Sequence, residues 1–222
     1  MDLMQAATQR HSVRQYVNKT IDDETAKALQ ATIDECNANG LHFQLILNEP
    51  KAFDGFMAKY GKFSDVQNYI ALVGKKGNNA DEKIGYYGAK VMLVAQTLGL
   101  NTCRVAMSYK KIKTAFVVDD GEKLFSVLAL GYGKTQGVQH KSKLPTDVGI
   151  CKASQTPDWF TDGIKTALLA PTAMNQQKFR FTLEADGKLQ ASAGMGFYTK
   201  MDLGIAKYFF ELGANIGKID WN

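Results

Sequence analysis

The 222-residue chain has few cysteines and no long apolar run. Its three cysteines, Cys36, Cys103 and Cys151, are odd in number, far apart and without CxxC spacing. They therefore predict neither a disulfide framework nor a zinc site, and they favour three reduced thiols. No window approaches the roughly 18 consecutive apolar residues of a membrane span, and residues 1–10 have neither an apolar signal core nor a cleavage site. We expect a cytoplasmic protein.

The common catalytic fingerprints are also absent. G-x-S-x-G, H-E-x-x-H and G-x-G-x-x-G do not occur, and the three histidines are scattered, so neither a hydrolase triad, a metal site nor a Rossmann site is indicated. The GKT at 133–135 resembles the end of a P-loop, but Leu128 stands where that motif requires glycine. Cys103 follows a predicted strand, where a buried structural thiol is favoured over a nucleophile. The chemistry is therefore expected to belong to a cofactor rather than to catalytic side chains.

The composition is that of a soluble globular protein, with 45% hydrophobic and 22% charged residues. The net charge of +5 raises the possibility of a nucleic-acid binder, but the positive charges are dispersed and no stripe of Lys and Arg alternates with aromatics. An anionic small ligand is enough to explain the charge.

Hydrophobic periodicity predicts a mixed α/β chain. The run at 84–98 is apolar nearly all round, which is typical of a buried helix, and Gly99 ends it. Gly74 is expected to close a short apolar strand, and the polar, Gly- and Lys-rich segment at 131–144 is expected to be a loop that favours functional residues. Helices are expected at 22–39, 53–60, 84–98, 158–169 and 201–216, and strands at 42–47, 68–73, 102–106, 124–130 and on both sides of a turn at 186–187.

Two pairs of segments suggest an internal repeat. Residues 31–47 and 166–183 both follow the order helix, small polar loop, strand, and the helices at 84–99 and 201–214 both carry Gly, Ala and Lys within an apolar sequence. Each pair alone is compatible with chance. Because the two pairs occur in the same order, they favour a duplicated half.

Three polar segments are candidates for ligand binding. Arg10 and Arg14 flank Ser12 and can surround one phosphate, although composition alone favours a solvated basic turn. Lys141 and Lys143 form a second such pair within the predicted loop, although this segment taken singly favours a surface charge run. The segment 170–177 (APTAMNQQ) offers backbone and amide groups to a polar heterocycle, or is a simple helix stop and turn.

Together these residues resemble the FMN-dependent nitroreductases. The resemblance rests on RHSVR, GYYGAKVMLVAQTLGLNTCRV, LALGYGK, HKSKLP and, most specifically, LLAPTAMNQQKFRF, and it covers nearly the whole chain. The last motif lies near the C-terminus and precedes DLGIAK, which is similar to a nitroreductase subfamily with an internally duplicated half. The resemblance implies an α+β fold with a central, mainly antiparallel sheet flanked by helices and two pseudo-repeats.

The same resemblance suggests how one chain forms one FMN site. Residues 1–148 would be a first half that keeps the phosphate-binding motif, and 149–222 a second half that keeps the flavin-ring loop; the counterpart of that loop in the first half reads ECNAN at 35–39. This complementary loss implies one composite FMN-binding unit per chain. The protein would be either a monomer that imitates the family's dimer or a homodimer.

The resemblance also assigns roles to individual residues. Lys178 and Phe179 replace the family's usual Pro and Trp, and Phe209 stands where the subfamily often has His, which affects substrate shape more than flavin binding. The expected cofactor-binding residues are Arg10, Ser12, Arg14, Lys141 and Lys143 at the phosphate, His11 near the flavin or ribityl chain, Arg104, Val105, Ala106 and Met107 through backbone N–H groups, and Pro171, Thr172, Ala173, Asn175 and Gln177 at the isoalloxazine.

The function implied is an NAD(P)H oxidoreductase. Hydride would pass from NADH or NADPH to FMN, and then to a nitroaromatic, a quinone or a similar small acceptor in a ping-pong reaction. A non-catalytic FMN-binding or flavin-storage protein is the main alternative, and a scaffold that has lost the cofactor is a second. Neither nucleic acid nor a membrane is expected as a partner.

Overall fold

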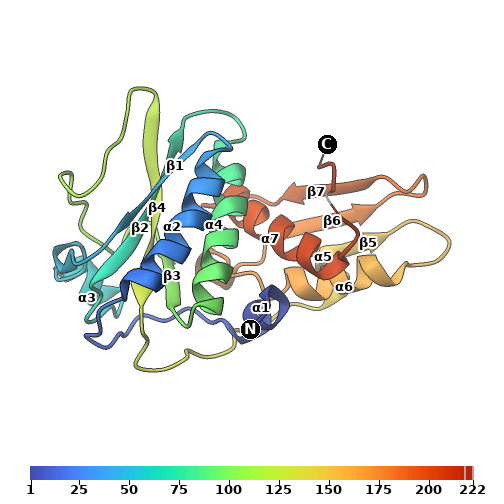
Figure 1. Ribbon diagram of the computed structural model, residues 1–222. Coiled ribbons are helices and arrows are strands. Elements are labelled where there is room, and N and C mark those ends of the chain that lie inside the picture. Colours follow the sequence, from blue (N-terminus) through green and yellow to red (C-terminus); the bar gives the residue numbers. More distant parts are fainter. Residues whose placement is uncertain (218, 222) are drawn as a thin grey trace. The chain divides into compact units, whose positions relative to one another are not determined.

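The computed structural model describes residues 1–217 and 219–221, and they form two compact units that are treated separately (Figure 1). The first unit consists of Met1–Gln9, Asp81–Lys90 and His140–Asn222, and the second of Arg10–Ala80 and Val91–Gln139. Helix α4 (Ala80–Thr97) contributes residues to both. Within the described residues, no helix has the length and apolarity needed to cross a membrane.

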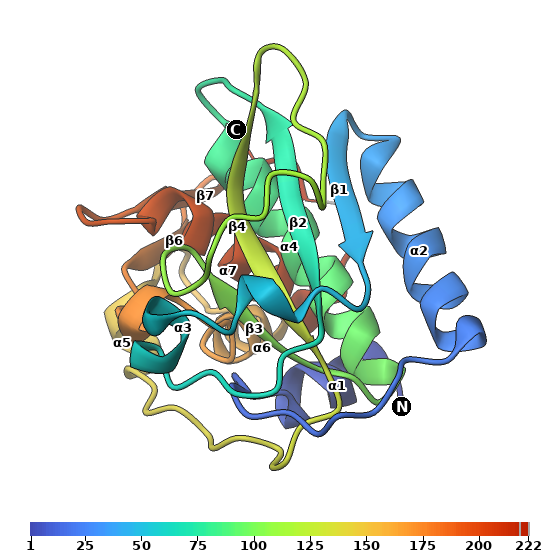
Figure 2. The same ribbon diagram turned by 90° about the vertical axis from the view of Figure 1, so that its left-hand side faces the viewer.

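The second unit is built on a four-stranded antiparallel sheet in the order β1-β2-β4-β3. Helix α2 packs beside β1 (Figure 2). The strands are β1 (Leu41–Ile46), β2 (Asn68–Lys75), β3 (Asn101–Val105) and β4 (Glu122–Gly131), and the helices are α2 (Asp23–Asn37), the 3-10 turn η1 (Pro50–Ala52) and α3 (Phe56–Tyr60).

Local sequence explains these elements. In β2 every residue except Lys75 is buried, so its apolar run does not alternate as a half-exposed strand would. Helix α2 begins after Asp22, whose carboxylate accepts a hydrogen bond from the backbone N–H of Thr25 at 2.8 Å. Leu29 and Ile33, four residues apart on one face of this helix, are fully buried.

The first unit packs helices against a three-stranded sheet in the order β5-β6-β7, in which β5 and β6 are parallel and β6 and β7 antiparallel. Phe181 of β6 and Phe210 of α7 stack with ring centroids 4.6 Å apart. The elements are α1 (Leu3–Gln9), α5 (Pro145–Val148), β5 (Gly149–Cys151), α6 (Asp158–Ala167), the 3-10 turn η2 (Ala173–Asn175), β6 (Phe179–Leu183), β7 (Leu189–Ala193) and α7 (Thr199–Ala214).

Two glycines bring the backbones of α4 and α7 together inside the first unit. A Cβ on Gly85 would overlap the carbonyl oxygen of Met201, and a Cβ on Gly204 would overlap the carbonyl oxygen of Glu82. The contact is reciprocal, because each glycine meets the carbonyl three residues before the other. This reciprocity is what a two-fold relation between the repeated helices predicts. The duplication itself stays a prediction.

The α+β class and the mainly antiparallel pairing are confirmed, two boundaries are corrected, and two short elements are added. Gly74 does not close β2, because it pairs with both neighbouring strands and the strand continues to Lys75. The helix expected at 53–60 begins only at Phe56, because the chain first makes a 3-10 turn and Gly55 precedes the helix in an extended conformation. Helix α5 and strand β5 were not predicted, since each is too short to show a period.

Candidate functional site

The segment from Arg10 to Tyr16 lies along the end of the second unit's sheet. The backbone N–H of Val13 donates to Thr102 of β3 at 3.1 Å. The Tyr16 hydroxyl donates to the carbonyl of Val13 at 2.8 Å and contacts that of Ala129 at 3.3 Å. These bonds hold the segment in an extended conformation and fix the direction of its side chains.

Arg10 is a buried cation that forms no ion pair with any of the residues the structure describes. It is 4% exposed, and its guanidinium Nη2 donates to Ser12 Oγ at 3.4 Å, a long hydrogen bond. Its Nε is buried and has no hydrogen-bond partner within residues 1–217 and 219–221. Burial lowers the pKa of Arg10 to about 10, so the group remains charged at neutral pH. A desolvated charge of this kind is costly unless an anion compensates it.

The predicted phosphate-site residues that follow Arg10 in the sequence differ from it in their exposure to solvent. Arg14 is exposed, with its guanidinium carbon 5.9 Å from the centre of the Phe63 ring, and His11 is half-buried. Ser12 is half-buried and pairs with Thr102 in an isolated bridge. Arg14 is therefore accessible to solvent, whereas Arg10 of the same motif is buried.

The backbone stretch expected near the flavin straddles the end of β3. Arg104 and Val105 belong to the strand and pair with Leu128 and Val127 of β4, whereas Ala106 and the exposed Met107 follow it. The neighbouring Cys103 is buried, and burial raises the pKa of its thiol. This agrees with the structural thiol expected from the sequence.

In the first unit, the loop after α6 has an unusual backbone. Met174, Asn175 and Gln177 adopt φ values of 51°, 53° and 45°, in the left-handed region that side chains such as those of Met and Gln rarely enter. Strained conformations of this kind persist where surrounding contacts hold them, and they cluster at binding sites. The loop, which includes Pro171 and Thr172, therefore has a backbone conformation that a simple helix stop and turn would not require.

Gln177 holds this loop against the basic segment before α5. Its side chain is 2% exposed; Nε2 donates to the carbonyl of Lys141 and to Asn175 Oδ1, both at 2.8 Å. Its Oε1 accepts from the backbone N–H of Lys143 at 2.9 Å, and Lys143 Nζ donates to the Gln177 carbonyl at 3.0 Å. Asn175 Nδ2 also donates to the Lys141 carbonyl at 2.8 Å. The two predicted motifs of this unit therefore form one structure.

A carboxylate that the sequence reasoning missed anchors the same loop. Asp202 in the first turn of α7 is fully buried, and both its oxygens lie 3.0–3.1 Å from the backbone nitrogen of Ala173. Its Oδ2 also accepts from Gln176 Nε2 at 2.7 Å. The signal in the sequence is an acidic residue inside an apolar helix.

Asp202→Asn is expected to loosen the loop. The carboxylate accepts hydrogen bonds from the Ala173 N–H and from Gln176 Nε2, and the NH2 group of an asparagine would have to face one of these two donors. Loss of a charge-assisted hydrogen bond costs about 1.5–3 kcal/mol. The unfolding temperature should fall by about 2–4 °C for each kcal/mol lost, and protease should cleave the loop faster. Asp162→Asn, which removes an exposed carboxylate paired with Lys165, is the control and should change neither. Equal behaviour of the two variants would refute the anchoring role.

The predicted site residues thus divide between the units. Arg10, His11, Ser12, Arg14 and the 104–107 stretch belong to the second unit, and the Lys141–Lys143 segment and the 171–177 loop belong to the first. Within the first unit the structure brings lysines and loop into direct contact.

The chain was also compared with known proteins. A sequence profile of the family described as "Putative TM nitroreductase" matches residues 2–214, nearly the whole chain. The chain belongs to this nitroreductase family. Membership identifies it as an oxidoreductase enzyme and agrees with the resemblance of its motifs. No curated protein matches the sequence.

Solved structures show that the fold is that of the nitroreductases. A "putative nitroreductase" from Thermotoga maritima matches with a TM-score of 0.67 at 18% identity, covering 96% of this chain and 83% of that one. A "putative nitroreductase in complex with FMN" from Desulfovibrio desulfuricans matches with a TM-score of 0.54, also at 18% identity, covering 71% of this chain and 98% of that one. At this identity the matches support the fold alone.

Proposed function

We propose that this nitroreductase-family protein binds FMN and transfers hydride from NADH or NADPH to nitroaromatics, quinones or similar electron-poor acceptors. Within the structure, the observation that carries the cofactor assignment is the buried Arg10, whose charge lacks a counter-ion among the described residues. An FMN phosphate is a dianion that supplies the missing charge and accepts from guanidinium N–H groups. The FMN bound by the Desulfovibrio relative supports the same cofactor.

The residues present fit this cofactor. In the proposal Arg10, Ser12 and Arg14 hold the phosphate, with His11 near the ribityl chain and backbone N–H groups of 104–107 directed to the ring. Lys141 and Lys143 add positive charge. Because the side chains of Thr172 and Asn175 bond within the first unit, with Gln177 N and the Lys141 carbonyl respectively, the 171–177 loop would meet the ring mainly through its backbone. One composite FMN site per chain stays a prediction from the complementary motifs of the sequence.

Bound FMN would supply the hydride chemistry, and the protein would supply orientation and charge. The loop's contribution is rigidity: Asp202, Gln177 and the left-handed residues hold its backbone in one conformation before any ligand arrives. A preformed loop loses less conformational entropy on binding. The lysines contribute fixed positive charge beside it, which attracts an anionic ligand.

The test is an anaerobic titration of the FMN-loaded protein followed by its visible absorption. We expect NADH or NADPH to bleach the flavin band and a quinone or nitroaromatic to restore it, which would establish both half-reactions separately. Bound flavin that neither nicotinamide bleaches would contradict the reductase proposal and favour the flavin-storage alternative. A colourless protein that takes up no FMN would refute the cofactor assignment as well.

A further inference from the structure

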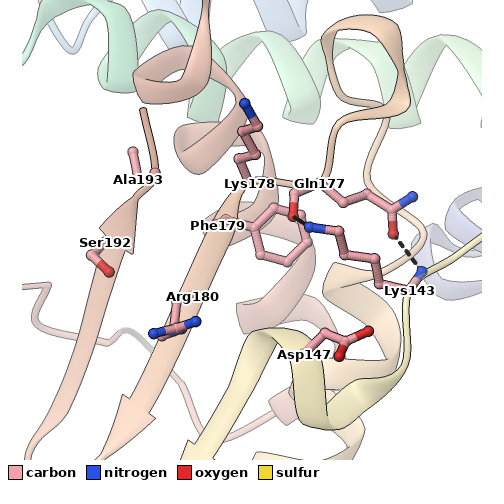
Figure 3. A pocket seen from close by; sticks show the side chains of 9 residues that line it. Lys143, Asp147, Gln177, Lys178, Phe179, Arg180, Ser192 and Ala193 are labelled. Carbon is pink, nitrogen blue, oxygen red and sulfur yellow. Dashed lines mark hydrogen bonds between the residues drawn. The ribbon is translucent and has the colours of Figure 1, made fainter. Parts of the chain in front are cut away.

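A surface pocket of about 300 Å³ lies in the first unit beside the 171–177 loop (Figure 3). Its sheet side is formed by the exposed face of β6 and β7, on which Arg180 is paired in register with Ser192. Lys143 and Asp147, from the segment that leads into β5, line the other side. Gln177, which is buried, connects this pocket to the loop assigned to the flavin ring.

The charge of the pocket is positive. Lys143, Lys178 and Arg180 line it together with a single carboxylate, that of Asp147. None of the three cations forms an ion pair within the described part of the chain. The ammonium groups of Lys143 and Lys178 each donate to a backbone carbonyl at 3.0 Å, which orients them without neutralising their charge.

The polar groups of the pocket are also held in place. Lys143 is fixed at two points, by its backbone N–H and by its ammonium, and both bonds are to Gln177. Asp147 accepts from the backbone N–H of Leu144 at 3.0 Å, so its carboxylate is used in the turn that begins α5. Arg180 projects from a strand that is paired on both sides, and the hydroxyl of Ser192 lies on the neighbouring strand. Such an arrangement suits an anionic oxygen group, which a guanidinium binds through two parallel hydrogen bonds.

We propose that this pocket binds the anionic group of a redox substrate, a carboxylate or a phosphate. The inference rests on the proposed function, since it concerns which acceptor or donor the flavin serves. The chemistry is shared by an acceptor such as an aromatic carboxylate and by the 2′-phosphate of NADPH. Lys178 contributes one of the cations of the pocket.

The experiment uses three variants of the full-length protein. Arg180→Gln removes a pocket cation, Asp147→Asn removes the pocket's carboxylate while keeping an acceptor for Leu144, and Lys188→Gln removes an exposed cation from the β6–β7 turn outside the pocket. Calorimetric titration with 4-nitrobenzoate, and with its neutral methyl ester as the uncharged partner, measures binding without turnover. The KM for NADPH and for NADH is then measured for each variant.

The expected result has opposite signs for the two pocket variants. Arg180→Gln should weaken binding of 4-nitrobenzoate, or raise the KM for NADPH, by roughly tenfold, the loss expected of one charge-assisted hydrogen bond. Asp147→Asn should strengthen the same interaction, and Lys188→Gln should leave it unchanged. An effect on 4-nitrobenzoate alone identifies the acceptor as the anionic partner, and an effect on NADPH alone identifies the donor.

Two results would overturn the proposal. One is an Arg180→Gln protein that binds 4-nitrobenzoate and uses NADPH as the wild type does. The other is an equal loss of 4-nitrobenzoate binding or of NADPH affinity in Arg180→Gln and Lys188→Gln. That result would show that the overall surface charge, and not the pocket, attracts the anion. Failure of the reductase assignment is distinguishable, because it would appear as wild-type flavin that NADH does not bleach, while the titration with 4-nitrobenzoate still reports on the pocket.

Discussion

The Arg10→Met variant is expected to unfold at a higher temperature than the wild type when flavin is absent. Arg10 is buried and has no counter-ion among the described residues, so its charge is desolvated without compensation. Methionine fills similar space without that cost, and even buried ion pairs can be replaced by well-packed apolar side chains with a change that ranges from none to a gain of about 1–4 kcal/mol. For a chain of this size, each kcal/mol corresponds to about 2–4 °C.

The pH dependence of this cost has a defined sign. Because burial lowers the pKa of Arg10 to about 10 in the folded protein, the unfolded chain holds the proton more tightly. The destabilisation is therefore fully present below about pH 10 and is relieved as the pH rises above that value. The wild type and Arg10→Met should thus differ most at neutral pH.

Added FMN should reverse the order of stability. The wild type would gain from binding FMN, whereas Arg10→Met should bind it about 100-fold more weakly, since truncating one member of a buried charge pair costs about 2–5 kcal/mol. Differential scanning calorimetry with and without FMN measures both effects. Arg14→Met, which changes an exposed cation in the same segment, is the matched control and should not raise the unfolding temperature of the flavin-free protein. A flavin-free Arg10→Met protein that unfolds below the wild type would show that Arg10 serves the fold rather than a ligand.

Gly204→Ala is expected to prevent the normal packing of α4 and α7. The added methyl group would overlap the Glu82 carbonyl oxygen and lie 2.8 Å from the backbone nitrogen of Tyr86, and backbone atoms cannot move aside as a flexible side chain can. The crossing also includes the buried Lys207, which pairs with Glu82. Separating the helices should cost about 3 kcal/mol or more, because overpacking in a tight core costs about 1–3 kcal/mol even where side chains can adjust.

The measurement is urea unfolding followed by circular dichroism. Gly77→Ala is the control, because a Cβ at Gly77 meets nothing within 4 Å and its backbone is not left-handed. Its stability should lie within about 1 kcal/mol of the wild type. Gly85→Ala should resemble Gly204→Ala, since the contact is reciprocal. A Gly204→Ala protein with wild-type stability would contradict the close approach of the two helices.

Much of the fold could be predicted because its elements carry strong local patterns. Helix α4 and strand β2 each contain a long apolar segment, and the turn at Asp186–Gly187 joins β6 and β7 as expected. The extension of β2 beyond Gly74 could not be predicted in the same way. It depends on two neighbouring strands that supply hydrogen bonds, and these come from distant parts of the sequence.

The sequence indicates candidate residues for the site but not their geometry. The RHSVR and APTAMNQQ segments stood out by their chemistry, yet nothing local distinguishes the buried Arg10 from the exposed Arg14. The left-handed conformations of Met174 and Gln177 go against the preferences of those residues and depend on contacts made by Asp202 and by the Lys141–Lys143 segment. The sequence does not mark Arg180 as a binding residue, because a single arginine on a strand indicates a binding site only when the other residues that line its pocket are known.

The most direct test of the central claim compares FMN with riboflavin, which lacks the phosphate, in the wild type and in Arg10→Met. Fluorescence titration gives four dissociation constants and hence the coupling between the phosphate and the guanidinium. We predict that the wild type prefers FMN by about 100-fold and that Arg10→Met loses most of this preference while binding riboflavin as the wild type does. Equal preference for FMN in both proteins would contradict the assignment of the phosphate to Arg10.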